Sequence, residues 1–328
     1  MRILLTRVSR HLVVLIPASM LLGFAAGLVW DVSWFKSLVL PATFLMIYPM
    51  MVNFKPQAAL SMKDSKPVAA SLVQNFAIIP LIGFGLGSLF FADRPELFIG
   101  LILASLFPTS GMTISWTGFA KGNVEAAVKM TVVGLIVGAL VAPFYLQALA
   151  GKLIPVNITE VSLQILLIVF LPMILGWATR KSLVETVGKV AFQKKWAPIF
   201  PGISTIGVLV IVFIAIALKA KGLVASPDVL PAILVPLAIF YAINFLLSTV
   251  VGKLFFDRDN AIALVYGTVM RNLSIALGIA VTAFGPQTAL VLAVGYIIQV
   301  QAAAWYVKFT PSVFGPALEE VRASSSAA

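Results

Sequence analysis

The feature that most constrains this chain is a series of long, unbroken apolar runs separated by short polar loops. A helix that crosses a bilayer requires about 20 mostly apolar residues. The alternation of apolar and polar residues that marks outer-membrane strands is absent. We therefore predict an all-α membrane protein with ten transmembrane helices, numbered 1 to 10 in chain order and formed by residues 12–30, 35–53, 68–92, 97–119, 126–150, 161–178, 199–218, 229–251, 260–284 and 287–309.

The composition indicates the same class of protein. Of the 328 residues, 61% are hydrophobic and 11% are charged, whereas a soluble domain has about 45–50% apolar and about 25% charged residues. This excludes an ordinary soluble enzyme, a disordered protein and a nucleic-acid binder, so the net charge of +11 requires a membrane explanation. The chain has no Cys and a single His, His11, which excludes disulfides, Cys- or His-based metal sites and a His-dependent catalytic triad. We expect no enzyme activity, no catalytic residue, no bound metal and no cofactor.

The Lys and Arg residues are distributed unevenly between the loops. Seventeen lie in the two terminal segments and the loops on their side of the predicted membrane, and five lie in the opposite loops. Because positively charged loops stay on the cytoplasmic side, we predict a multi-pass protein of the cell (inner) membrane with both termini in the cytoplasm. Residues 317–328 are predicted to form a polar C-terminal tail.

The second half of the chain repeats short features of the first half. Leu89-Phe90-Phe91 at the end of helix 3 matches Leu254-Phe255-Phe256 at the end of helix 8, at an offset of 165 residues. The glycines that follow helices 4 and 9, Gly122 and Gly285, match at an offset of 163. We predict two halves of five helices each, residues 1–155 and 156–316. Since five is odd, the second half inserts upside down, and inverted repeats of this kind are typical of secondary transporters.

The repeat pairs two segments near the midpoints of helices 4 and 9, residues 108–111 (Pro-Thr-Ser-Gly) and 271–274 (Arg-Asn-Leu-Ser). Pro108 has no N–H to donate, and Gly111 weakens a helix further. Thr109, Ser110 and Asn272 are residue types that cap a restarting helix. We predict that both helices are broken at the bilayer midplane, run antiparallel and cross at their breaks. The alternative is a simple proline kink in helix 4 and an uninterrupted helix 9.

Arg271 is the one charged residue in the middle of an apolar run, and no Asp or Glu lies near the centre of any run. A buried Arg needs partners. Two restarting half-helices would bring positive dipole ends to the crossing, which favours an anionic ligand such as a carboxylate, phosphate or sulfonate. In a second, compatible interpretation Arg271 braces the crossing through backbone carbonyls. The predicted substrate site consists of Arg271, Asn272, Ser274, Thr109, Ser110, Thr113, Gln74, Asn75 and Gln299.

Several of these segments carry motifs of a known family. Helix 2 contains residues 46–51 (Met-Ile-Tyr-Pro-Met-Met), helix 3 contains Asn75-Phe76 followed by Pro80, and helix 4 contains residues 108–112 (Pro-Thr-Ser-Gly-Met) and 120–123 (Ala-Lys-Gly-Asn). This pattern resembles the bile acid/sodium symporter superfamily, most closely its arsenical-resistance permease branch, over nearly the whole chain. The resemblance implies ten helices, a panel of helices 1, 2, 6 and 7, and a core of helices 3–5 and 8–10 in which helices 4 and 9 cross unwound.

The chain departs from that family at its ligand positions. The resemblance implies that arsenite carriers have a Cys at the position of Thr109 and acids at the positions of Asn272 and Gln299. The thiolate of that Cys suits a soft metalloid. In the sodium-coupled branch the corresponding Glu and Gln fall on Gly267 and Arg271. Because a hard cation prefers oxygen ligands and negative charge, these departures predict transport that does not require sodium.

We predict a secondary active transporter that moves a small, anionic solute by alternating access of core against panel. Its partners would be that solute and the lipid bilayer, and no nucleic acid. An arsenite or antimonite efflux permease is the alternative within the transporter class. A channel or a non-transporting membrane sensor on the same scaffold is the alternative of another class, and saturable counterflow would discriminate, since a channel does not show it.

Overall fold

The computed structural model describes residues 12–54, 64–151, 158–225 and 227–316. Within these ranges every regular element is a helix. The basic N-terminal segment before residue 12 and the predicted polar tail 317–328 lie outside the described residues.

Each of the ten apolar runs contains helix. The first five runs form α2 (Leu12–Val29), α3 (Phe35–Val52), α4 (Ser65–Val73) continued by η2 (Gln74–Ile78) and α5 (Ile79–Phe90), the pair α6 (Pro95–Leu106) and α7 (Gly111–Phe119), and α8 (Val124–Ala150). The last five form α9 (Ile158–Ile165) with η3 (Leu166–Phe170) and α10 (Leu171–Val187), α11 (Lys189–Ala191) with η4 (Phe192–Trp196) and α12 (Phe200–Ala225), α13 (Val229–Phe255), α14 (Arg258–Val269) with α15 (Leu273–Ile279) and η5 (Ala280–Phe284), and α16 (Pro286–Phe314).

By length and apolar composition, eight of the described helices can cross a membrane, and nine can if the bent pair α6–α7 is one span. The chain is therefore a multi-pass membrane protein. The first run contains a shorter apolar helix, within α2, that does not reach the same length. The tenth predicted span would be this helix, so the count of ten spans stays a prediction.

Helix 3 differs from the sequence-based expectation, because one π-helical turn, η2, interrupts it. Pro80 follows this turn and has no N–H to donate to the carbonyl of Phe76, four residues earlier. The Tyr145 hydroxyl, from α8, donates to that carbonyl instead. The π-turn therefore gives the backbone a way to pass a proline while a neighbouring helix satisfies the carbonyl that loses its helical donor.

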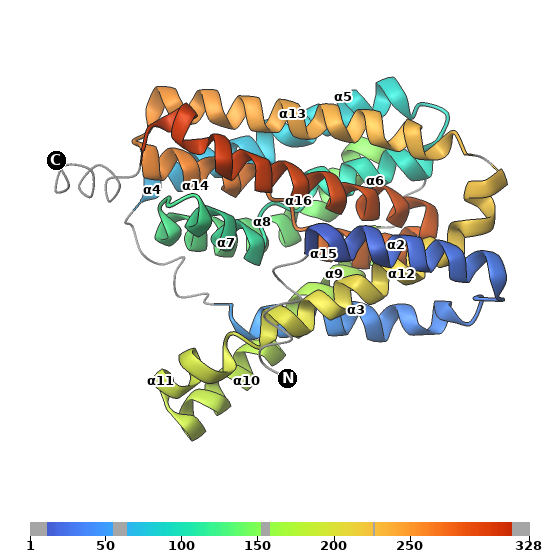
Figure 1. Ribbon diagram of the computed structural model, residues 1–328, viewed down its shortest axis with the longest axis horizontal. Coiled ribbons are helices and arrows are strands. Elements are labelled where there is room, and N and C mark those ends of the chain that lie inside the picture. Colours follow the sequence, from blue (N-terminus) through green and yellow to red (C-terminus); the bar gives the residue numbers. More distant parts are fainter. Residues whose placement is uncertain (1–11, 55–63, 152–157, 226, 317–328) are drawn as a thin grey trace.

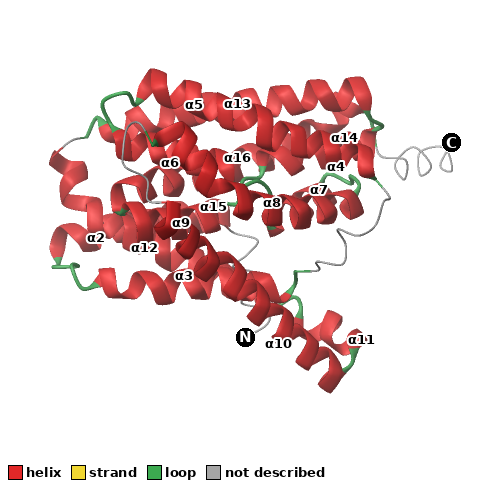
Figure 2. Ribbon diagram, turned by 180° about the vertical axis from the view of Figure 1, so that it is seen from behind, coloured by secondary structure: helices red, strands yellow, loops and turns green. Residues whose placement is uncertain are grey.

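The helices form two groups in space. Figures 1 and 2 show α2, α3, α9 and α12 together along one edge of the bundle, and α5 and α13 along the opposite edge. Within the first group α12 packs on both α2 and α3, and α3 packs on α10. In the second group α13 packs on α14, and α6 packs on α5 and α16. Helices α10 and α11 project from the body of the bundle in both views.

The α14–α15 pair lies at the centre of the molecule. Every residue from 261 to 280 is buried, on all sides of both helices. A helix that is hydrophobic all round is expected to be enclosed by other helices. Arg271, which lies between α14 and α15, is therefore placed in the least solvent-accessible part of the structure, with an exposed fraction of 0%.

Candidate functional site at the two helix breaks

The first break, residues 107–110, separates α6 from α7, whose axes are bent by 61°. Ser110 caps the restarting helix: its Oγ accepts a hydrogen bond of 3.2 Å from the N–H of Met112. The N–H of Ser110 in turn donates to Oγ1 of Thr113 at 3.1 Å. Together these bonds form a capping box, which satisfies N–H groups at a helix start that have no partner inside the helix.

Thr109 occupies a strained position in this break. Its φ is +57°, in the left-handed region that a β-branched residue rarely adopts. The Thr109 hydroxyl donates to the Pro108 carbonyl at 2.7 Å. Gly134 of α8 lies directly opposite, where an added Cβ would come within 2.9 Å of Thr109 Oγ1. The close approach of α8 holds the Thr109 side chain in place.

The second break, residues 270–272, separates α14 from α15. Met270 and Asn272 leave the helical region, with ψ values of 81° and 69°. Asn272 Oδ1 accepts from the N–H of Ile275 at 3.3 Å and so caps α15. The N–H of Asn272 donates to the carbonyl of Phe107 at 2.7 Å. The two breaks therefore contact each other directly, and helical hydrogen bonding is not continuous through helix 9.

Gln299 of α16 satisfies the backbone of the second break. Its Oε1 accepts from the N–H of Arg271 at 2.8 Å, and its Nε2 donates to the carbonyl of Arg271 at 3.2 Å. The hydroxyl of Tyr241, from α13, donates to the same Oε1 at 2.9 Å. One buried amide thus bonds both the N–H and the carbonyl of Arg271, which otherwise have only the Val269 carbonyl and the Leu273 N–H as partners. Unwound backbone away from water requires such partners.

The Arg271 guanidinium is surrounded by four oxygen atoms. Nε donates to the Ala104 carbonyl at 3.0 Å, and Nη1 donates to the Thr268 carbonyl at 3.0 Å. Nη1 also donates to Oδ1 of Asn75, and Nη2 donates to the Ser105 carbonyl. A guanidinium has five N–H groups, so these four bonds leave one N–H. Within the described residues no acid pairs with Arg271.

Asn75 is itself fixed by hydrogen bonds to Ser71 of α4 and to Gly267 of α14. Its Nδ2 donates to Oγ of Ser71 at 3.0 Å and to the carbonyl of Gly267 at 2.9 Å. The amide therefore presents its oxygen to Arg271, because both of its N–H groups are engaged elsewhere. A Cβ on Gly267 would lie 2.4 Å from the sulfur of Met130, so the glycine allows α14 to pack closely against α8 at this point.

A polar stripe on α13 completes the buried network. Ser248 Oγ donates to Gln74 Oε1 at 2.9 Å and lies 2.6 Å from Oγ1 of Thr268. Asn244, one turn earlier, is fully buried, and neither of its amide atoms has a partner; Nε2 of Gln74 also has none. Buried amides without protein partners are places where ordered water is expected.

The structure brings most of the predicted site residues to the two breaks. Arg271, Asn75 and Gln299 share one hydrogen-bond network, Thr109, Ser110 and Thr113 build the first break, and Asn272 joins the breaks. Ser274 lies apart from Arg271's partners and bonds the Tyr296 hydroxyl at 2.5 Å. The predicted site left out Tyr241, Asn244 and Ser248 of α13, although their spacing places them on one helix face. It also missed Thr268 and Ser71.

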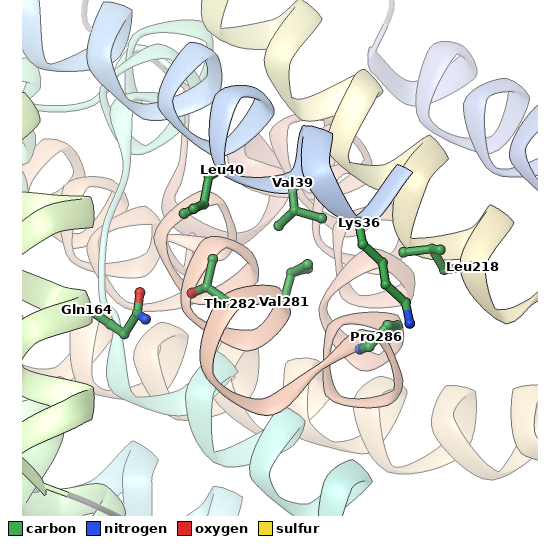
Figure 3. A pocket seen from close by; sticks show the side chains of 8 residues that line it. All are labelled: Lys36, Val39, Leu40, Gln164, Leu218, Val281, Thr282 and Pro286. Carbon is green, nitrogen blue, oxygen red and sulfur yellow. The ribbon is translucent and has the colours of Figure 1, made fainter. Parts of the chain in front are cut away.

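A crevice of about 310 Å³ lies between the two helix groups, at the end of the bundle where α3 and α16 begin. Figure 3 shows Lys36 of α3 reaching across it toward Pro286, with Gln164 and Thr282 on the other side. Of the described residues that line it, Lys36 is the only charged one, and the lining also includes Val39, Leu40, Leu218 and Val281. None of the nine predicted site residues lines this crevice.

A second, apolar groove of about 680 Å³ shares Leu40 and Gln164 with the crevice and extends between α3 and α10. Between the crevice and the second break, α15 touches α3. A Cβ on Gly278 would lie 2.7 Å from Cγ2 of Thr43. This contact between the two helix groups separates Thr282 in the crevice from Asn272 in the break.

Comparison with known proteins identifies relatives across most of the chain. The family model described as the sodium bile acid symporter family matches residues 40–226. The arsenical-resistance protein Acr3 of Corynebacterium glutamicum is 24% identical over 271 residues, which cover 78% of this chain and 73% of that protein. Acr3 of Alkaliphilus metalliredigens is 23% identical over 332 residues, covering 92% of each chain. The uncharacterized sodium-dependent transporter YocS of Bacillus subtilis is 25% identical over 224 residues, covering 68% and 66%.

Proposed function

The chain belongs to the sodium bile acid symporter family and is a membrane transporter, and we propose that it moves a small anion by alternating access without sodium. The observation that supports an anionic solute is the positive charge at two places, the crevice between the helix groups and the helix breaks inside the second group. Lys36 is the one charged residue lining the crevice, and Arg271 is the one charged residue at the breaks. Among the described residues no acid pairs with either side chain. The charge of Arg271 offsets the negative carbonyl ends of α6 and α14, so the positive N-terminal ends of α7 and α15 and the charge of Lys36 remain to favour an anion.

The role of Arg271 in this proposal follows from its contacts. Four of its five N–H groups already donate to protein oxygens, so direct ligation of a solute has at most one donor. We assign it the role of a fixed charge. Direct contacts would come from the starts of the restarting half-helices, where Ser110 and Asn272 cap α7 and α15, since helix N-termini favour anions. The remaining predicted residues, Thr109, Thr113, Ser274, Gln74, Asn75 and Gln299, would shape the site.

Sodium independence is supported by the same contacts. The carbonyls of Ala104, Ser105 and Thr268 are the oxygen ligands that a hard cation prefers, and the guanidinium already occupies the space between them. A second cation there would meet the charge of Arg271. The relative YocS carries the words sodium-dependent in its name, so sodium coupling is the alternative that the transport assay must test.

The finer architecture is also part of this proposal. Residues 1–155 and 156–316 would be inverted repeats with ten spans and both termini cytoplasmic. The panel would comprise α2, α3, α9–α10 and α11–α12, and the core would comprise α4–α8 and α13–α16. The grouping of helix contacts supports this division, and the crevice at the boundary is where a rocking motion would open and close a path.

Arsenite or antimonite efflux is the second candidate function, because two of the relatives are named arsenical-resistance proteins. In this chain Thr109 offers a hydroxyl, not a thiolate, and that hydroxyl bonds the Pro108 carbonyl. A soft metalloid prefers sulfur ligands. Expression of the chain in a metalloid-sensitive host tests this candidate: full restoration of growth on arsenite would replace the anion proposal.

The test of the main proposal is counterflow in proteoliposomes. Vesicles loaded with a panel of unlabelled carboxylates, phosphate and sulfonates are given the labelled anion outside, in sodium, potassium or choline buffer. We expect saturable counterflow of at least one anion at equal rates in the three buffers. Uptake that is abolished when sodium is replaced by choline would refute sodium independence, and non-saturable flux without counterflow would indicate a channel.

A further inference from the structure

Three of the four oxygen atoms around Arg271 are carbonyl oxygens at the C-terminal ends of helices. The Ala104 and Ser105 carbonyls lie in the last turn of α6, which ends at Leu106, and the Thr268 carbonyl lies in the last turn of α14, which ends at Val269. Carbonyls in a last helical turn have no donor within the helix. Two negative helix ends therefore converge on one point, and the Asn75 amide oxygen adds the fourth ligand.

This arrangement has the chemistry of a cation site. Each helix C-terminus carries roughly half a negative charge, so two of them offset about one positive charge without any acid. The ligands are all neutral oxygens, and none is exposed to water: Asn75 and Arg271 have exposed fractions of 1% and 0%. Unwound carbonyls and half-helix C-termini are the groups that bind monovalent cations inside membrane transporters.

We propose that these four oxygens form a monovalent-cation site that the chain fills permanently with its own guanidinium. The site is thus occupied in every molecule, whatever the ionic composition outside. It follows that a variant without the Arg271 side chain has a vacant site, able to take up a free cation in its place. Free guanidinium ion is the best fit, because it has the same planar set of donors and is more weakly hydrated than an ammonium group.

The experiment is cation rescue of thermal stability in the purified full chain. Arg271→Ala is melted in choline buffer with and without millimolar guanidinium chloride, and separately with sodium or potassium chloride. We expect the variant to melt below the wild type and to regain several degrees, with saturation, on adding guanidinium. A ligand that binds the folded state alone raises its stability in this way. The melting temperature of the wild type should not respond.

Arg258→Ala is the matched control. Arg258 also donates to backbone carbonyls, those of Gly315, Lys121 and Ala120, but its side chain is partly exposed and also pairs with Asp259 at 2.9 Å. Water replaces its guanidinium there, so we expect no saturable rescue. Equal rescue of both variants, or none of Arg271→Ala by any of the three cations, would overturn the proposal.

A second pair of variants covers the case in which Arg271→Ala does not fold. Arg271→Lys keeps a cation among the four oxygens, whereas Arg271→Met keeps bulk but leaves them without a donor. We expect the melting temperature of the Lys variant to be clearly higher than that of the Met variant and to be unaffected by guanidinium. If Met is as stable as Lys, the site needs no charge and the inference is wrong.

The consequence for transport rests on the proposed function, while the melting experiments do not. If the chain is a sodium-independent carrier, transport by Arg271→Ala should become dependent on an added monovalent cation. Cation rescue of stability without any anion transport would leave the cation site standing and refute the proposed function. Cation-independent transport by a variant that also shows no rescue would refute the cation site alone.

Discussion

The N–H of Asn272 donates to the carbonyl of Phe107 at 2.7 Å, although the two residues are 165 positions apart. That separation equals the offset at which Leu89-Phe90-Phe91 matches Leu254-Phe255-Phe256. In an inverted repeat, corresponding residues meet each other at the pseudo-twofold axis. The proposed repeat pairs residues 108–111 with 271–274 at an offset of 163, so this contact joins residues within two positions of correspondence. It lies where the two broken helices touch, as the proposed repeat predicts.

Gln299 is expected to matter for stability, because it pairs both backbone groups of Arg271. Gln299→Leu keeps the bulk but removes two buried hydrogen bonds, at about 0.5–1.5 kcal/mol for each bond. The Arg271 N–H is then left with the Val269 carbonyl alone, and the Arg271 carbonyl with the N–H of Leu273 alone. Gln299→Glu retains the acceptor and is expected to lose less. Thermal melting of both variants checks this order. A Leu variant as stable as the wild type would show that other groups or water satisfy the break.

Gly278 is expected to control movement between the two helix groups. In Gly278→Ala the new Cβ would lie 2.7 Å from Thr43 Cγ2, and such overpacking typically costs about 1–3 kcal/mol. We expect α15 and α3 to separate and the transport rate to fall while the protein still folds. Gly222→Ala is the control, since nothing lies within 4 Å of a Cβ there. It should be neutral, or stabilising by up to about 1 kcal/mol. Equal transport by both variants would contradict the prediction.

Lys36 is expected to set the preference of the crevice for anions. Lys36→Gln removes the one charge of the lining, and Lys36→Glu reverses it. We expect the Michaelis constant for the anion to rise in that order, with the largest effect at low ionic strength, because exposed charges are screened by salt. Lys219→Gln serves as a control for net charge. If Lys36→Glu transports the anion as well as the wild type, the crevice is not its entrance.

Asp257 is expected to make stability depend on pH. Its Oδ1 caps α14 by accepting from the N–H groups of Asp259 and Asn260, each at 3.1 Å. Burial raises the pKa of this carboxyl, but the bonds from Asn260 and Asp259 outweigh it and leave the pKa below its usual value. A depressed pKa means that the stabilisation is full above the unfolded-state value and is lost as the pH falls through the folded-state value.

For Asp257→Ala we therefore expect a loss of about 0.5–2 kcal/mol at neutral pH, shrinking as the pH approaches 3. Asp257→Asn keeps an acceptor that does not titrate, so its stability should vary less with pH than that of the wild type. Melting curves between pH 3 and pH 7 test both variants. A constant difference between wild type and Asn variant over this range would show that Asp257 does not titrate there.

The predicted orientation can be tested cleanly because the chain has no Cys. Lys189→Cys and Lys221→Cys place single thiols on exposed residues in loops of opposite predicted sides. We expect an impermeant maleimide added to whole cells to label position 221 and not position 189. Labelling of position 189 alone would invert the topology. Lys36 precedes helix 2 on the same predicted side as Lys221, so its crevice would then face the cytoplasm.

The sequence alone determined the class of the protein and the location of the helix breaks. Hydrophobicity over a run of about 20 residues decides whether a helix enters a membrane, and this is a local property. The effects of Pro108 and Gly111, and the capping chemistry of Ser110 and Asn272, are also local. They predicted the interruptions that the structure places at residues 107–110 and 270–272.

Only the tertiary structure decided what the buried charge contacts. The sequence left open whether Arg271 binds an anion or braces backbone carbonyls, and its contacts with Ala104, Ser105 and Thr268 are to carbonyls. The first two of these partners lie more than 160 positions away in the chain and present main-chain atoms. Every residue type carries the same carbonyl, so no sequence pattern marks which one accepts a bond. The packing of α6 against the α14–α15 break selects them.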